Sequence, residues 1–273
     1  MTQAERRAYL IRMLLQERHE RFVLPGDEEA QKRLLRALFN VREPGEASAE
    51  FLEVQDAYLR EEILSRGITR DRDRKGRPLA GLQGSRGITR DRDLVPVRDR
   101  FCIWKGDITT LECGAVVNAA NRRMLGCFHP NHGCIDNAIH TFSGVQLRLA
   151  CDRVMGGKLK NTGEAIITPA FNLPCDFVVH AVGPEVHGPL TPEHERLLAA
   201  TYVSCLEAAG RVHVRSMAFC CLSTGEFHFP PLRAAEIAVE TVSAHINNYP
   251  WMEKVIFNVF KDSDAAIYQR LLG

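Results

Sequence analysis

The most chemically distinctive segment spans residues 125–140 and reads LGCFHPNHGCIDNAIH. Within it Cys127, His132 and Cys134 follow the pattern C-x4-H-x-C, which places two thiols and an imidazole just before an expected helix. These ligand types favour Zn²⁺. A structural zinc site usually takes four protein ligands, for which His129 is the nearest further candidate, whereas three ligands leave a position for water or a substrate oxygen. The spacing alone is also compatible with two buried thiols and a surface histidine.

Polar and small residues also follow several apolar segments that we expect to be strands. They are Asp107 and Ile108, then Asn118, Ala119 and Asn121, and finally Ser223, Thr224, Gly225, Glu226 and Phe227. Asp107 is suited to accept a hydrogen bond from an amine edge such as that of a purine, although stabilising a turn is an equal alternative. Asn118 and Asn121 carry neutral donors and acceptors suited to a ribose. Residues 223–227 lead through two prolines into a helix, so their backbone amides can face an anion.

The part of the chain from Phe101 onward must position these residues. In it, short apolar segments alternate with segments whose apolar residues have helical spacing. We expect strands at 101–104, 114–117, 165–168, 176–182, 216–222 and 254–260, and helices at 135–154, 191–209, 231–247 and 264–272. Near-continuous apolar strands separated by helices indicate a mostly parallel sheet covered on both faces. Ligands of such folds bind beyond the carboxyl ends of the strands. His180, inside one expected strand, is interpreted as a hydrogen-bonded core residue.

The first hundred residues have a different sequence pattern, with helical segments and no expected strands. Apolar residues at helical spacing predict three helices, over 3–19, 28–40 and 48–66. Asp27 and Ser48 are the expected N-caps of the second and third. The sequence SRGITRDRD occurs at 65–73 and again at 85–93. Two such short copies cannot form a solenoid, and we interpret them as a local duplication that forms an exposed, flexible loop.

The composition is that of a folded globular protein, with 273 residues of which 45% are apolar and 25% charged. The 35 basic and 34 acidic residues nearly cancel, which argues against nucleic acid as a main partner. No segment approaches the roughly 18 apolar residues of a membrane span, and the charged start is unlike a secretion signal. We therefore expect an intracellular, cytoplasmic protein with no membrane partner. Its nine cysteines are expected to be reduced and mostly buried.

Several blocks, in their order along the chain, resemble the motif series of macrodomains, the ADP-ribose-binding modules. They are GDIT (106–109), VVNAAN (116–121), DNAIH (136–140), TGEA (162–165), VHAVGP (179–184) and LSTG (222–225). The resemblance covers about residues 100–272. Most macrodomains have a run of glycines after the NAAN block, whereas this chain has GCFHPNHGCIDN. That segment and the helical N-terminal extension are similar to the zinc-containing branch of the family.

The resemblance implies a three-layer α/β/α sandwich with a mixed, mostly parallel sheet. It divides the chain into a helical extension (1–64), a flexible linker with the duplication (65–98) and a macrodomain (99–273). The implied ligand contacts are Asp107 and Ile108 at adenine, residues 223–227 around the diphosphate, Asn121 and Asp136 near the distal ribose, and Asn118 and Ala119 elsewhere along the ligand. Cys127, His132 and Cys134 are implied to hold zinc.

The implied activity is zinc-dependent removal of mono-ADP-ribose from acidic or serine side chains, with mono-ADP-ribosylated proteins as partners and ADP-ribose as product. Such cleavage passes through an oxocarbenium-like state, and zinc could activate a water or orient a ribose hydroxyl. Asn121 and Asp136 are the candidate catalytic residues; Asp136 could be a base, a partner behind the metal ligands, or a helix cap. The alternatives are a reader module without turnover, an ADP-ribose-1''-phosphate phosphatase, and a structural zinc module whose N-terminal helices dock a partner. The oligomeric state is left open.

Overall fold

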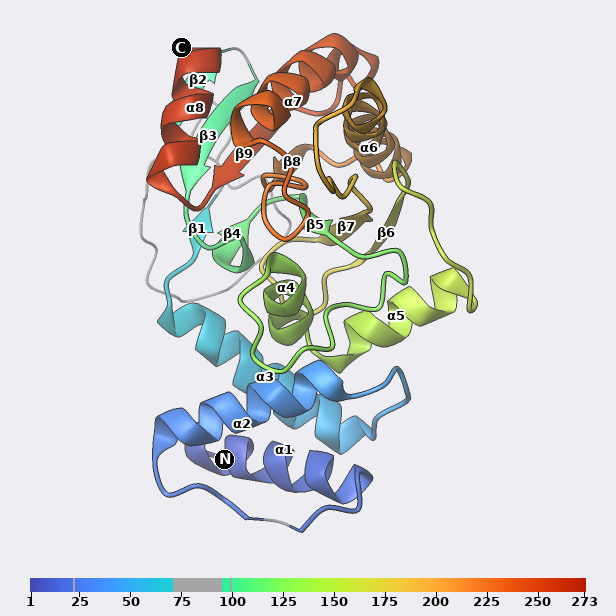
Figure 1. The fold of residues 1–273 in the computed structure, drawn as a ribbon. Helices are drawn as coiled ribbons and strands as arrows, with labels where there is room; N and C mark the ends of the chain where they lie inside the picture. The colour runs from blue at the N-terminus through green and yellow to red at the C-terminus, as the bar shows by residue number, and fades with distance from the viewer. Residues whose placement is uncertain (22, 71–94, 99) are drawn as a thin grey trace.

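The computed structural model describes residues 1–21, 23–70, 95–98 and 100–273, and it joins a stack of helices to an α/β body (Figure 1). The N-terminal helices are α1 (Gln3–Glu17), α2 (Glu28–Val41) and α3 (Ala49–Ser65). Each begins at a side chain that accepts a hydrogen bond from a backbone amide of the first turn: Thr2, Asp27 and Ser48. The predictions of three helices and of the Asp27 and Ser48 caps are confirmed.

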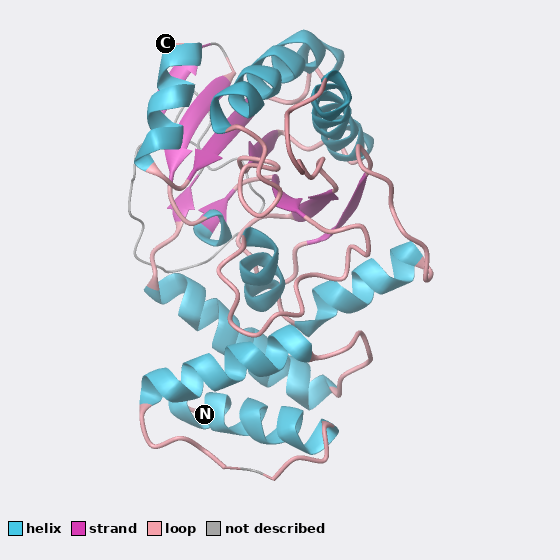
Figure 2. Cartoon of the chain, in the orientation of Figure 1, coloured by secondary structure: helices cyan, strands magenta, loops and turns pink. Residues whose placement is uncertain are grey.

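A seven-stranded sheet forms the centre of the α/β body (Figure 2). In spatial order its strands are β2 (Val95–Arg98), β3 (Phe101–Lys105), β9 (Lys254–Val259), β8 (Ser216–Phe219), β5 (Ala115–Ala119), β7 (Phe177–Ala181) and β6 (Ala165–Pro169). The interior pairs are parallel, and the two outer pairs, β2 with β3 and β6 with β7, are antiparallel. The prediction of a mixed, mostly parallel sheet is therefore confirmed. Two short strands, β1 (Thr69–Arg70) and β4 (Leu111–Glu112), pair separately.

Helices cover the sheet in two layers. One layer contains α4 (Ile135–Ser143) and α5 (Val145–Met155), which contact β5 and β6. The other contains α6 (Pro192–Arg211), α7 (Pro231–His245) and α8 (Asp262–Leu272), which pack side by side. Two single-turn helices, η1 (Ile108–Thr110) and η2 (Ile246–Asn248), complete the body.

The single helix expected over 135–154 is instead two helices, α4 and α5. They meet at Gly144, whose φ of +94° interrupts the helix and lies in the region that favours glycine. A Cβ on Gly144 would also lie 2.6 Å from Nε2 of Gln55, so the close approach of α3 requires glycine here. Helical periodicity continues across this break, which is why the apolar pattern alone did not reveal it.

The N-terminal helices are docked firmly onto the α/β body. Their apolar core, which includes Leu35 and Phe51, extends to Val145 of α5. Gln55 of α3 is fully buried; its Oε1 accepts from the Val145 amide at 3.0 Å and its Nε2 donates to Oε1 of Gln146 at 2.7 Å. Buried amides that lose such partners destabilise a protein by about 1–3 kcal/mol, so these bonds fix α3 against α5.

The segment predicted to be a flexible linker, 65–98, is described only at its two ends. Ile68 is buried, β1 pairs with β4, and residues 95–98 form the edge strand β2. These ends belong to the folded structure. The described residues do not include the rest of the duplication, which is residues 71–73 of the first SRGITRDRD copy and the whole second copy, 85–93. No helix in the described part of the chain is long and apolar enough to cross a membrane.

Candidate active site

A cavity of about 470 Å³ lies beyond the carboxyl ends of the parallel strands. Its volume is in the range of small-molecule sites. Distant parts of the chain line it, including Arg36 of α2, residues 106–108 after β3, Ala119 of β5, residues 133–135 before α4, residues 220, 221 and 223–227 after β8, and Asn258 and Phe260 at the end of β9. The structure therefore brings together Asp107, Ile108, Ala119 and residues 223–227, as the strand-end argument predicts.

One end of the cavity presents a carboxylate held in a fixed orientation. Oδ1 of Asp107 accepts from the amide and the hydroxyl of Thr109 at 3.0 and 2.7 Å. Its Oδ2 accepts from Nη1 of Arg66 at 2.7 Å. The guanidinium of Arg66 in turn lies 3.7 Å from the ring centre of Phe142. Phe260, 76% exposed, adds an aromatic face to the same cavity.

The loop after β8 is shaped to receive an anion. Ser223 and His228 adopt φ values of +63° and +55°, which turn the chain sharply at both ends of residues 223–228. Among the described residues, the amides of 225–227 have no backbone acceptor, and the buried Ser223 hydroxyl has no partner. Gly183 allows this loop to approach, because a Cβ there would lie 2.1 Å from Oγ of Ser223. Such unpaired donors in a tight turn form an anion-binding concavity.

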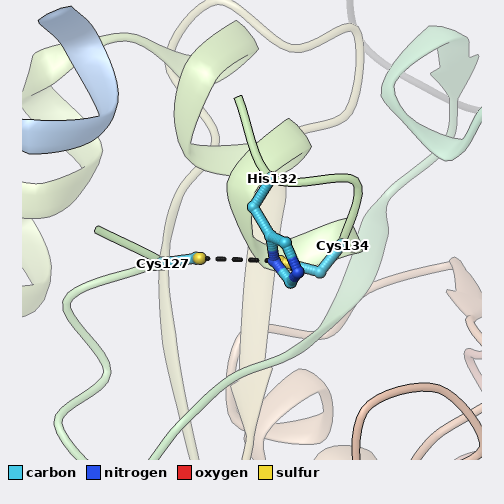
Figure 3. A group of neighbouring side chains, drawn as sticks. All are labelled: Cys127, His132 and Cys134. Atoms are coloured by element: carbon cyan, nitrogen blue, oxygen red, sulfur yellow. Dashed lines mark hydrogen bonds between the residues drawn. The ribbon is translucent and has the colours of Figure 1, made fainter. Parts of the chain in front are cut away.

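The metal loop, residues 127–134, brings the three predicted ligands together (Figure 3). The ligand atoms of Cys127, His132 and Cys134 lie within 4.8 Å of one another, and Sγ of Cys127 is 3.6 Å from Nδ1 of His132. Tetrahedral zinc with ordinary bond lengths separates a sulfur from a nitrogen ligand by about 3.6 Å, so the residues fit the ion. Within the described residues, no further His, Cys, Asp or Glu joins this group; His129 stays outside it.

The metal loop borders the cavity. Gly133 and Cys134 line the cavity wall, and Nε2 of His132 lies 3.8 Å from Oε1 of Glu226 in the loop after β8. Cys134 is also the N-cap of α4, where its sulfur accepts from the Asn137 amide at 3.4 Å. Burial raises the pKa of Cys134 and so disfavours its thiolate, whereas a bound cation would favour it.

Asn118 and Asp136 lie beneath the metal loop and do not line the cavity. Asn118 is fully buried, and its Nδ2 donates to Oδ1 of Asp136 at 2.7 Å and approaches Nδ1 of His180 at 3.1 Å. Burial raises the pKa of Asp136 to about 6, an effect that the Asn118 hydrogen bond and the charge of Arg148 oppose. Asn118 thus holds Asp136 rather than facing a ligand in this cavity.

His140 and His180 extend this buried network. Nε2 of His140 lies 3.6 Å from Oδ1 of Asp136. His180 and His140 also approach Cys151, but Nε2 of His180 already contacts the Thr168 hydroxyl at 3.0 Å and its Nδ1 contacts Asn118. His180 is therefore a hydrogen-bonded core residue, as predicted.

Asn121 uses both ends of its amide within its own turn. Its Nδ2 donates to the Gly126 carbonyl at 3.1 Å, and its Oδ1 accepts from the Arg123 amide at 2.9 Å. It is not among the residues that line the cavity. The structure places Asn121 as a support for the turn that leads into the metal loop.

Sequence reasoning missed several side chains that shape the site, among them Arg36, Arg66 and Phe260. Phe260 directly follows β9, so the strand-end argument that selected Asp107 could have selected it. Arg36 and Arg66 act on residues 101 and 41 positions away, and no local pattern marks such contacts.

Comparison with known proteins gives the family. The profile of the Macro domain family matches residues 117–238. A protein-ADP-ribose hydrolase of Treponema medium is 49% identical and aligns over 100% of both chains. The chain therefore belongs to the macrodomain family.

Solved structures agree with this assignment. An Oceanobacillus iheyensis macrodomain mutant with ADPR is 34% identical, with a TM-score of 0.57, over 64% of this chain and 94% of that one. A Trypanosoma brucei macrodomain in complex with ADP is 26% identical, with a TM-score of 0.61, over 93% of this chain and 100% of that one.

Proposed function

We propose that this chain is a zinc-dependent hydrolase that releases mono-ADP-ribose from acidic or serine side chains of modified proteins. The observation that carries the proposal is the group Cys127, His132 and Cys134 at the wall of a cavity of ligand size. A module that only holds ADP-ribose has no need of a metal there, and a structural zinc site usually has a fourth protein ligand. The full-length similarity to the Treponema medium hydrolase supports the same activity.

In this proposal ADP-ribose lies along the cavity with its adenine at Asp107 and Phe260. The exocyclic amine donates to the carboxylate of Asp107, and the ring packs on the exposed face of Phe260. The unpaired amides of residues 225–227 and the hydroxyl of Ser223 receive the diphosphate. The distal ribose then extends toward Gly133 and Cys134, which line the far wall.

Cys127, His132 and Cys134 would hold the zinc ion. When bound, Zn²⁺ supplies a Lewis acid that can lower the pKa of a water or orient a ribose hydroxyl. The reaction breaks the bond between the anomeric carbon and the side-chain oxygen through an oxocarbenium-like state, and water supplies the new oxygen and the proton that the side chain takes.

Side chains that do not line the cavity support this bond cleavage through their charge and their hydrogen bonds. Asp136 is ionised above about pH 6, and its negative charge favours the positive charge that develops on the ribose. Asn118 fixes that carboxylate through the 2.7 Å hydrogen bond. Asn121 supports the turn that enters the metal loop. We therefore assign Asp136 and Asn121 positioning and electrostatic roles.

The test combines metal content with turnover. Purified protein and a Cys127→Ala variant are assayed for bound zinc and for release of ADP-ribose from proteins modified on glutamate, aspartate or serine, with and without a chelator. We expect stoichiometric zinc and turnover in the native protein and loss of both in the variant. Full turnover by metal-free Cys127→Ala would refute the zinc mechanism, and ADP-ribose binding with no turnover on any substrate would favour a reader module.

A further inference from the structure

Helix α2 of the N-terminal extension reaches the metal side of the cavity. It packs against α4 (Figure 1), and its Arg36 lines the cavity beside Gly133 and Cys134. Nη2 of Arg36 donates to the backbone carbonyl of His132 at 3.0 Å. Nε and Nη2 also donate to Oδ1 of Asn137 at 3.1 and 2.8 Å. One guanidinium thus joins a metal-ligand residue to the first turn of α4.

Asn137 passes this contact on to the rest of the metal loop. Its side chain is fully buried, and its Nδ2 donates to the carbonyl of His129 at 3.0 Å. Its backbone amide donates to the sulfur of Cys134 at 3.4 Å. Arg36 thus anchors the side chain that holds His129, and the backbone amide of the same residue contacts Cys134, so Asn137 touches both ends of the segment from His129 to Cys134.

A second α2 side chain holds the same loop. Asn40 is buried, and its Oδ1 accepts from the amide of Asn131 at 2.9 Å while its Nδ2 donates to the hydroxyl of Thr141 at 2.9 Å. Asn131 has a φ of +55°, so the chain turns sharply just before His132. The loop's own backbone supplies a turn bond from the His132 amide to the His129 carbonyl at 3.2 Å, and the contacts from α2 hold the loop against α4.

We propose that Arg36 is a positioning residue that fixes His132 and Cys134 for metal binding, so that the N-terminal extension is part of the site. The proposal rests on the proposed function, since it concerns the metal of that site. Groups that orient metal ligands from outside the coordination sphere typically change metal affinity by about 10- to 100-fold when removed. Lysine cannot replace Arg36 fully, because its single ammonium does not reproduce the planar fork that binds two acceptors.

The first test measures zinc affinity by chelator competition in the absence of nucleotide. We expect Arg36→Met to weaken zinc binding by about 10- to 100-fold and Arg36→Lys by less. Arg33, exposed on the same helix, provides the matched control, and Arg33→Met should bind zinc as the native protein does. Equal zinc affinities for Arg36→Met and Arg33→Met would overturn the proposal.

The second test measures hydrogen exchange of backbone amides in metal-free protein and so does not depend on zinc. We expect residues 129–134 to exchange faster in Arg36→Met and Asn40→Ala than in Arg33→Met, with the strands of the sheet unchanged. Unchanged exchange of 129–134 would overturn the proposal even if zinc affinity fell. A native protein that binds no zinc but shows the exchange difference would refute the proposed zinc dependence and leave the role of Arg36 in ordering the loop standing.

Discussion

The buried histidines behind the metal loop make stability depend on pH. His180 is fully buried, and burial lowers its pKa from 6.5 to about 3. Because Asn118 donates to its Nδ1, the proton of the neutral ring is assigned to Nε2, which faces Thr168. The unfolded chain takes up a proton at this residue as the pH falls through 6.5, whereas the native state does so only near pH 3. Stability is therefore lost as the pH falls between these values.

The size of this effect follows from the two pKa values. A pH of 5 is 1.5 units below the ordinary histidine pKa of 6.5, so His180 lowers the free energy of unfolding by about 2 kcal/mol at this pH. Burial also lowers the pKa of His140, which adds to the loss. Asp136 acts in the opposite direction. Its pKa is raised to about 6 in the native state, which therefore binds the proton at a higher pH than the unfolded chain does, and this adds about 1 kcal/mol to the free energy of unfolding at pH 5.

A comparison of variants isolates the contribution of His180. Urea unfolding is measured at pH 7 and pH 5 for the native protein and for His180→Asn. The drop in unfolding free energy between the two pH values should be about 2 kcal/mol smaller in the variant. His187, whose side chain is 76% exposed, supplies the control, and His187→Asn should retain the native pH dependence. A pH dependence of His180→Asn equal to that of the native protein would refute the reasoning.

Two further predictions concern the adenine end of the cavity, with calorimetric titration of ADP-ribose as the measurement. Arg66→Met should weaken ADP-ribose binding about two- to fivefold, the modest size expected for a half-exposed ion pair, whereas Arg60→Met, within the helix that Arg66 caps, should not. An unchanged dissociation constant would show that Asp107 keeps its orientation without Arg66. Phe260→Ala should weaken the binding of ADP-ribose by about 5- to 100-fold through lost base stacking and leave the binding of ribose 5-phosphate unchanged. Equal losses for both ligands would place Phe260 elsewhere than under the base.

Local patterns were sufficient for most of the fold. The caps at Asp27 and Ser48 and the six apolar strand segments are determined by neighbours within a few residues, and each is found near its predicted place. The break at Gly144 was missed because the helical periodicity of the apolar residues continues across it, and the close approach of Gln55, 89 positions earlier in the chain, leaves no local mark. A pattern of apolar residues carries no information about such a contact.

The site was predictable where residue type and strand position suffice. Asp107, residues 223–227 and the metal-loop ligands could be named because they follow strands or share one short segment. The orientation of Asn118 could not, since alternation along β5 does not say whether an amide meets a ligand or a buried carboxylate. The contribution of α2 was equally hidden, because it arises only when the extension docks.

One cavity is lined both by Arg36 of the N-terminal helices and by residues of the α/β body, and this has a practical consequence for inhibitor design. Compounds that occupy only the adenine and diphosphate regions would meet features common to nucleotide-sugar pockets. A compound with an acidic arm that reaches the guanidinium of Arg36 would instead depend on a group supplied by the N-terminal helices. Selectivity over macrodomains that lack such helices would then come from that arm.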